Sequence, residues 1–247
     1  MKGTFFNNSL EWKIETVGEA WSQGDPLKGT LTVTNHGNSA VSLQTAGVAL
    51  AYAEIKKVHS RDESALKFES TTLFAEKEVS PKQTVTLEFD FKLSENSPIT
   101  DKKSSYFLCY GKDQKESHLQ LHVKPQAMFL KITELLDNFH RFKTKEVKTT
   151  KNGIEFKIDS PDSREFANVE KLLLTTRFDG ENLVMDFEFE VKKLDHSSIT
   201  TKLGKEKVKN SQTLTPKQYS FGRGMINQDG ILKTFQTVLD QVKLKPY

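Results

Sequence analysis

The residues with the clearest chemical potential are three carboxylates at alternate positions, Asp186, Glu188 and Glu190. They interrupt apolar residues in the segment Leu183-Val-Met-Asp-Phe-Glu-Phe-Glu-Val191. In a β-strand, alternate side chains lie on one face, roughly 7 Å apart. Three carboxylates on one face could hold a cation. They could also act as acid and base on carbohydrate, because inverting glycosidases hold their two carboxylates at a similar separation. Alternating carboxylates are also typical of a solvated sheet face, and we favour that interpretation.

A second group is the polar, basic segment at residues 195–217. Residues 192–247 contain 11 Lys/Arg and 4 Asp/Glu, a net charge of +7, whereas the whole chain carries +3. Such a segment can contact phosphates or an anionic membrane surface. Acidic, amide and hydroxyl residues interrupt the run, which favours a solvated long loop or an irregular edge strand. The candidate contacts for an anion or a partner are Lys202, Lys205, Lys207 and Lys209.

The remaining candidates are weaker. His118 and His122 would lie on one face of a strand about 13 Å apart, too far to share a metal ion bound at about 2.1 Å. Phe221-Gly-Arg-Gly224 resembles a fragment of an RNA-binding segment but lacks the aromatic-rich strand around it, which favours a flexible loop. Cys109 is the only cysteine, which excludes an intrachain disulfide, and its strand-like neighbours indicate a buried structural thiol.

The sequence contains no Gly-x-Ser-x-Gly, Walker, Gly-x-Gly-x-x-Gly or His-Glu-x-x-His motif. We therefore predict a protein that is not an enzyme, with no catalytic residue, no cofactor and no metal site.

Strands must position most of these residues. Residues 84–93, Thr-Val-Thr-Leu-Glu-Phe-Asp-Phe-Lys-Leu, alternate apolar and polar side chains, as a strand with one buried face does. Turn signals such as Gly24-Asp25-Pro26 separate several short strands of this kind, which is typical of a β-sandwich. The other candidates in the first half are Leu10–Val17, Leu27–Asn35, Ala40–Val58 with one break, Ala65–Glu69, Thr72–Val79, Ser105–Tyr110 and Ser117–Val123.

The second half contains the best-defined local prediction. Val169–Phe178 and Leu183–Val191 flank Asp179-Gly-Glu-Asn182 and should form a hairpin. If Phe178 pairs with Leu183, Lys171 pairs with Glu190 and the apolar residues share the opposite face.

Apolar stripes at spacings of three and four predict a connecting helix near 127–139 and a C-terminal helix near 229–242, capped by Asn227 or Asp229. With 247 residues the chain is long enough for two domains, which we place at 1–124 and 125–247. Without an apolar leader or a membrane-length run, we expect a cytoplasmic protein.

The order of these features resembles a known family. Gly24-Asp25-x-x-x-Gly29 before an alternating strand is similar to the early turn of arrestin-fold proteins. Phe89-x-Phe91-x-Leu93 followed by Ser97-Pro98-Ile99-Thr100 looks like their strand and Pro-rich loop. The helix at 127–139 and the hairpin ending in Asp186-Phe-Glu-Phe-Glu-Val191 resemble the second domain of bacterial sporulation-control proteins of arrestin-like fold. Two departures are the short Cys109–Glu116 segment, which is longer in the family, and the basic tail, since the family tends to be acidic.

The resemblance implies a mostly β protein with two tandem arrestin-like, immunoglobulin-type β-sandwiches. It also implies a bacterial, cytoplasmic, non-enzymatic regulator or adaptor that binds protein partners. Sheet edges, interstrand loops or the interdomain groove would form the binding surface. The alternative is peripheral binding to an anionic membrane or nucleic acid through the basic segment.

Overall fold

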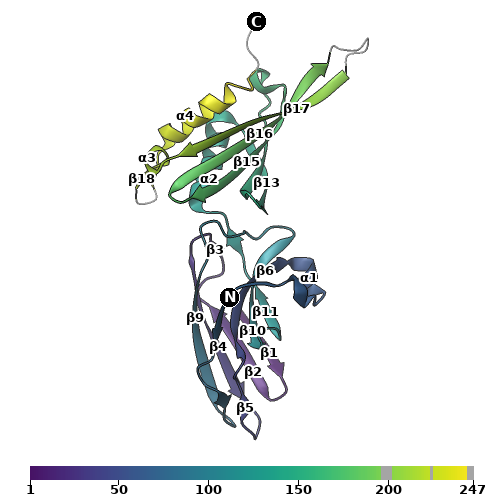
Figure 1. The fold of residues 1–247 in the computed structure, drawn as a ribbon, viewed down its shortest axis with the longest axis vertical. Helices are drawn as coiled ribbons and strands as arrows, with labels where there is room; N and C mark the ends of the chain where they lie inside the picture. The colour runs from purple at the N-terminus through teal and green to yellow at the C-terminus, as the bar shows by residue number, and fades with distance from the viewer. Residues whose placement is uncertain (196–201, 223–224, 244–247) are drawn as a thin grey trace. The chain divides into compact units, whose positions relative to one another are not determined.

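The computed structural model describes residues 1–195, 202–222 and 225–243, with side chains for all of these except residues 63, 193–195, 202 and 203. The chain divides into two compact units, Met1–Lys124 and Pro125–Tyr247 (Figure 1). Each unit is built mainly of antiparallel strands. The predicted mostly β fold class is confirmed.

The first unit is a sandwich of two four-stranded antiparallel sheets with one core between them. One sheet contains β1 (Lys2–Asn7), β2 (Leu10–Thr16), β4 (Pro26–Asn35) and β9 (Thr84–Lys92), in that order. The other contains β11 (Ser117–Gln120), β10 (Ser104–Lys112), β6 (Ala46–Glu54) and β7 (Lys67–Leu73). Two short pairs complete it: β3 (Trp21–Ser22) with β12 (Val123–Lys124), and β5 (Val41–Ser42) with β8 (Glu78–Val79).

The alternation predicted for residues 84–93 is present in β9. Val85, Phe89 and Phe91 are buried, Leu87 packs half-buried against the same core, and Thr86, Glu88 and Asp90 between them are exposed. Trp12, on β2, lies in the same core and stacks on Phe5 with ring centroids 5.9 Å apart. Each large side chain buried in this way stabilises the sandwich by roughly 1.5–3 kcal/mol.

The strand predicted to reach Val58 ends earlier, at Glu54. Residues Ile55–His59 instead form the short helix α1. Val58 joins a second small core with Phe107 and Cys109, on the side of β10 away from the main core. The apolar residues that looked like a strand extension are therefore used to cover the outside of this sheet.

The second unit is a five-stranded antiparallel sheet in sequential order (Figure 1). Its strands are β13 (Lys143–Thr150), β14 (Gly153–Asp159), β15 (Val169–Asp179), β16 (Asn182–Asp195) and β17 (Lys202–Leu214). After β17 come α3 (Pro216–Tyr219), β18 (Ser220–Gly222), β19 (Met225–Ile226) and α4 (Gln228–Leu239). Single 3-10 turns lie at Glu63–Ala65 in the first unit and at Arg164–Phe166 in the second.

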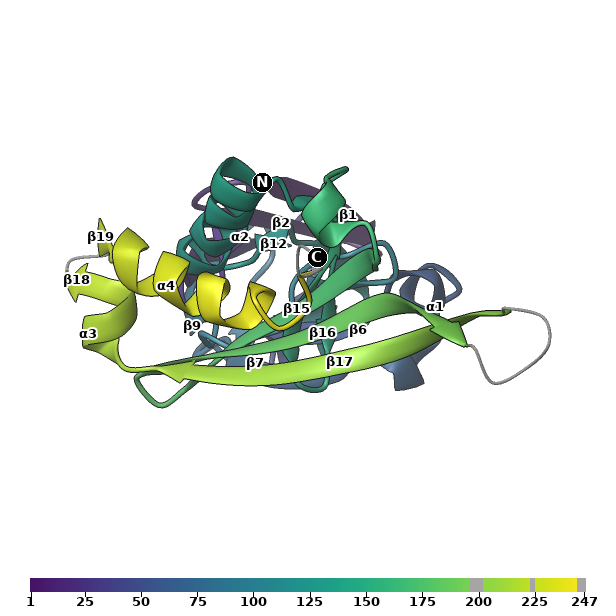
Figure 2. The ribbon, with the colours of Figure 1, turned by 90° about the horizontal axis from the view of Figure 1, so that it is seen from above.

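Helices form the second layer of this unit, in the place where the sequence predicts a second sheet. Figure 2 shows α2 (Ala127–His140) and α4 on the same side of the sheet. Phe129 of α2 stacks on Phe178 at 5.3 Å, and Phe235 of α4 meets Phe187 edge-on at 6.3 Å. The two predicted apolar stripes supply this layer, so the helix expected to connect two domains is part of the second unit's core. Asn227 caps α4 by accepting a hydrogen bond from the Gly230 amide at 3.1 Å.

Candidate functional site

The side of the second unit's sheet that faces away from α2 and α4, called here the outer face, carries most of the residues with chemical potential. The β15–β16 hairpin has the predicted register, with Phe178 opposite Leu183 and Lys171 opposite Glu190. Alternation then directs Leu183, Met185, Phe187 and Phe189 of β16 toward the helices. Asp186, Glu188 and Glu190 consequently lie together on the outer face.

From Lys202 to Leu214 the basic segment is a regular edge strand, and the loop alternative is wrong for these residues. β17 pairs with β16 without a register shift from Leu214 opposite Leu183 to Lys202 opposite Asp195. Between Lys205 and Thr213, the residues of β17 on the helix side are Glu206, Val208, Asn210 and Gln212, of which only Val208 is apolar. Leu214, the last residue of the strand, lies on the same side and is buried. Because that side is mostly polar, the two-residue hydrophobic period that predicts a strand is missing. The remaining sign of a strand in the sequence is the alternation of Lys205, Lys207 and Lys209 with other residues, which places the three lysines on one face.

The register places Lys205, Lys207 and Lys209 on the outer face beside β16. Lys207 bonds Glu188 at 2.6 Å, and Lys209 reaches the same carboxylate at 3.1 Å. Lys205 bonds Glu170 at 2.6 Å. The structure thus brings three of the four predicted lysines together, while the side chain of Lys202 lies outside the described ones.

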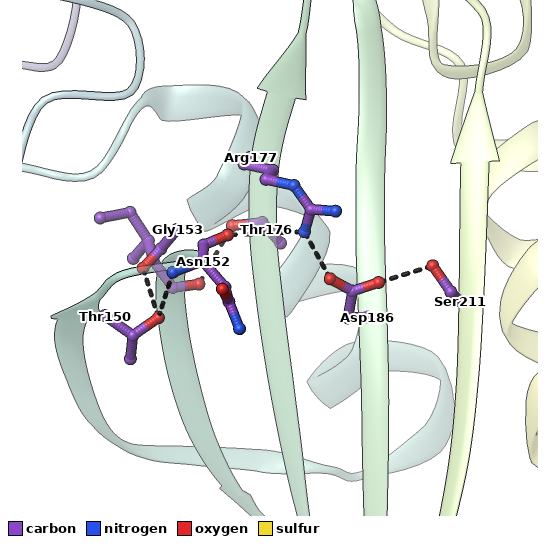
Figure 3. Close-up of polar contacts among 8 residues, drawn as sticks. Thr150, Asn152, Gly153, Thr176, Arg177, Asp186 and Ser211 are labelled. Carbon is purple, nitrogen blue, oxygen red and sulfur yellow. Dashed lines mark hydrogen bonds and ion pairs between the residues drawn. The ribbon is translucent and has the colours of Figure 1, made fainter.

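The other carboxylates of the outer face also have cationic or hydroxyl partners. Figure 3 shows Asp186 between the Arg177 guanidinium and the Ser211 hydroxyl, which donates to Oδ1 at 2.5 Å. Lys171 pairs with Glu190 at 2.8 Å. The outer face therefore carries a network of paired charges that are partly open to solvent, and surface pairs of this kind each contribute at most about 1 kcal/mol.

Electrostatics opposes a role for Glu188 as a general acid. Hydrogen bonds from Lys207 and, more weakly, from Lys209 hold the pKa of this carboxyl below its usual value. A general acid working near neutral pH needs a raised pKa. Glu188 is instead ionised at neutral pH and serves as the shared acceptor of two lysines.

The outer face is hollowed at its centre. A depression of about 510 Å³ lies over Leu173 and Thr175 of β15. Its rim is formed by Asn152, Glu155, Asp186, Glu188, Lys209 and Ser211. Charged and amide groups therefore surround a small apolar floor.

The β13–β14 turn closes one end of this hollow. The Asn152 amide donates to Thr150 Oγ1 at 3.3 Å, and Arg177 donates to the Asn152 carbonyl at 3.4 Å (Figure 3). Gly153 follows with φ of +131°, and a Cβ there would lie 2.4 Å from the Thr176 carbonyl oxygen. Only glycine allows the turn to approach β15 this closely.

The histidine and cysteine candidates lie apart from this face, in the first unit. His118 is on β11 with its ring 5.6 Å from that of Phe107. Burial lowers the pKa of His118, and the charge of the nearby His59 lowers it further by a smaller amount. Cys109 is buried, and desolvation raises the pKa of its thiol to about 12. Both properties are typical of an unreactive structural cysteine. Among the described residues, no group of three or more His, Cys, Asp or Glu side chains is arranged to hold a metal ion.

The Phe221–Gly224 motif falls partly outside the described residues, at 223 and 224. Its described part is β18, where the Phe221 side chain is 69% exposed. Within the described part of the chain, none of the helices has the length and apolar content needed to cross a membrane.

The fold is similar to a solved structure over nearly the whole chain. The sporulation control protein Spo0M from Bacillus subtilis aligns with a TM-score of 0.60 and 15% sequence identity, covering 95% of this chain and 99% of that one. A β-glucosidase from Listeria innocua aligns at a TM-score of 0.31 and 12% identity, over 47% of this chain and 16% of the glucosidase. No protein-family model and no curated protein sequence matches the chain. The likeness to Spo0M shows the fold.

Proposed function

We propose that this chain is a non-enzymatic, cytoplasmic regulatory protein of the sporulation-control kind, and that it acts as an adaptor by binding a protein partner. The observation that carries the proposal is the fold, which is similar to that of a protein named for sporulation control over 95% of the chain. A likeness that includes both units supports a role that uses the whole architecture.

The outer face supports binding more than catalysis. Asp186, Glu188 and Glu190 each have a cationic partner, and Glu188 has a depressed pKa. Surface ion pairs that solvent can reach are readily exchanged for pairs with another protein because each contributes little by itself. A partner with complementary charges can therefore bind here with little loss of internal stability.

The test is affinity capture of the full chain from its own cells, with quantitative mass spectrometry and the reverse capture by each partner found. We expect at least one protein to be enriched in both directions. The refuting result is turnover on a panel of hydrolase and transferase substrates that Glu188→Gln or Asp186→Asn abolishes while the fold, followed by circular dichroism, is unchanged.

A second candidate is peripheral binding to an anionic membrane or nucleic acid. The observation that favours it is the row Lys205, Lys207 and Lys209 on one face of one strand. It predicts binding to anionic vesicles or DNA that weakens steeply with salt and is lost when the three lysines become Glu. The carboxylates bonded to these lysines reduce the charge available for such a surface, so we rank this function second.

A further inference from the structure

We propose that the free edge of β17 accepts an extended segment of the partner as an added strand, and that this segment carries acidic side chains at alternate positions. The inference rests on the proposed adaptor function and names where the partner binds. β17 ends the order of the sheet, with β16 on one side of it. Figure 2 shows β17 along the border of the second unit.

This edge is long and unbroken, and its protection against an added strand is charge. Natural edge strands are shortened, bulged, interrupted by proline or lined with charged side chains such as lysine, because their unpaired backbone groups recruit other strands. The lysines of β17 repel most strands, but a strand with acidic side chains would neutralise them. β17 has 13 residues, contains no proline and pairs with β16 without a register shift. The opposite edge, β13, does have a register shift, between Thr144 and Glu146. The two edges of one sheet are therefore built differently, and β17 is the one suited to strand addition.

The charge on this edge defines the occupant. The side chains of Lys205, Lys207 and Lys209 are 64%, 58% and 70% exposed. Lys207 and Lys209 share one carboxylate, Glu188, so these three ammonium groups have two carboxylates between them. An ammonium group has three N–H donors, which leaves each lysine able to bond an acceptor on its other side.

Strand geometry matches this row of charges to a simple pattern. Lysines two residues apart repeat at roughly 7 Å, which is also the repeat of alternate side chains in an added strand. Acidic residues at every second position would each lie across from a lysine. On the helix side, the intervening residues of the added strand would lie beside Glu206, which is exposed, Val208, which is half-buried, and Asn210, which bonds Gln241 at 3.2 Å. Small or uncharged side chains fit there.

A second copy of the chain fits this edge poorly. If two β17 strands paired antiparallel with their outer faces on the same side, lysines would lie across from lysines. Like charges directly opposite one another destabilise a strand pair.

The probe is a fluorescein-labelled ten-residue peptide with Glu alternating with Thr and Val, measured by fluorescence anisotropy against the full chain. The matched control peptide has the same composition with its Glu residues contiguous. We expect the alternating peptide to bind at least about fivefold more tightly, because only it places each carboxylate across from a lysine. Equal affinity would overturn the proposal, since net charge alone would then account for binding.

Charge reversal locates the site. We expect the triple variant Lys205→Glu, Lys207→Glu and Lys209→Glu to weaken binding of the alternating peptide at least about tenfold. The control, Lys143→Glu, Lys145→Glu and Lys148→Glu, makes the same change of net charge on β13 and should alter affinity by less than about twofold. A loss of equal size in both variants would overturn the assignment to β17.

Hydrogen exchange tests the backbone part of the proposal without any substitution. In an antiparallel strand, alternate amides point to opposite edges, so an added strand should slow exchange at every second amide between residues 203 and 213. Unchanged exchange in this range at saturating peptide would overturn strand addition. Self-association of the free chain that the triple variant abolishes would assign the edge to a second copy. Comparable binding of phosphatidylserine vesicles or single-stranded DNA would assign the lysines to an anionic surface. Either assignment overturns the proposal.

This inference and the adaptor function fail in different ways. If capture from cells recovers the same partner with the triple variant as with the native chain, the β17 assignment fails and the adaptor function stands. If the chain instead turns over a substrate and binds no protein, the adaptor function itself fails.

Discussion

Two glycines in the turns of the second unit's sheet differ in one physical respect, and that difference predicts different costs for the same substitution. Gly153 ends the β13–β14 turn with φ of +131°, and Gly180 lies in the β15–β16 turn with φ of +57°. A Cβ at Gly153 would lie 2.4 Å from the Thr176 carbonyl oxygen and 3.0 Å from Arg177 Cβ. A Cβ at Gly180 would have no atom within 4 Å among those described.

The magnitudes follow from these contacts. Alanine at Gly180 must adopt the left-handed conformation, which costs roughly 1–2 kcal/mol. Alanine at Gly153 is strained by roughly 1–3 kcal/mol. It must also push β14 away from β15, which weakens hydrogen bonds of the ladder that contribute about 1 kcal/mol each. We expect Gly153→Ala to lower the free energy of unfolding by about 3–5 kcal/mol, at least about 2 kcal/mol more than Gly180→Ala.

The assay is urea denaturation followed by two signals. Trp12 and Trp21 are the two tryptophans of the chain, and both are in the first unit, so tryptophan emission follows that unit. Far-UV circular dichroism includes the sheet of the second unit and should show the shift caused by Gly153→Ala. Equal losses for the two variants, or a loss below about 1 kcal/mol for Gly153→Ala, would refute the close approach of the turn to β15.

Three further predictions concern single side chains. Cys109 should not react with a thiol reagent at pH 8 until urea unfolds the first unit, because burial raises its pKa to about 12; labelling of the native protein would contradict its burial. Phe235→Ala should lower the free energy of unfolding by about 3–5 kcal/mol because the ring is fully buried. The control Phe221→Ala should cost less than about 0.5 kcal/mol, since that ring is exposed. Because the folded pKa of Glu188 is depressed, its contribution is complete above the ordinary value of 4.5 and is lost as pH falls through the lower folded value. Glu188→Gln should therefore flatten the acid limb of stability against pH, and an unchanged limb would show that the Lys207 bond does not persist in solution.

Local patterning was sufficient where one face of a segment is apolar and the other polar. The register of the β15–β16 hairpin, the buried face of β9 and the two apolar helix stripes all follow from residue spacing. The outer-face position of Asp186, Glu188 and Glu190 follows from the same alternation. Periodicity reports which side chains share a face, and these segments have a clear difference between faces.

Patterning failed where both faces are polar or where another element changes the use of an apolar residue. β17 gave no hydrophobic period because Glu206, Asn210 and Gln212 occupy its helix side, and pairing with β16 decides its conformation. Val58 was predicted in a strand and lies in α1.

The sequence by itself determined that the chain is mostly β, which residues alternate, and that the candidate carboxylates share one face with Lys171. Only the tertiary structure decided that helices form the second layer of the second unit, because a helix stripe does not specify the element it covers. It also decided which lysine bonds which carboxylate. Those pairs join strands whose register depends on long-range backbone pairing, and local spacing carries no information about that pairing.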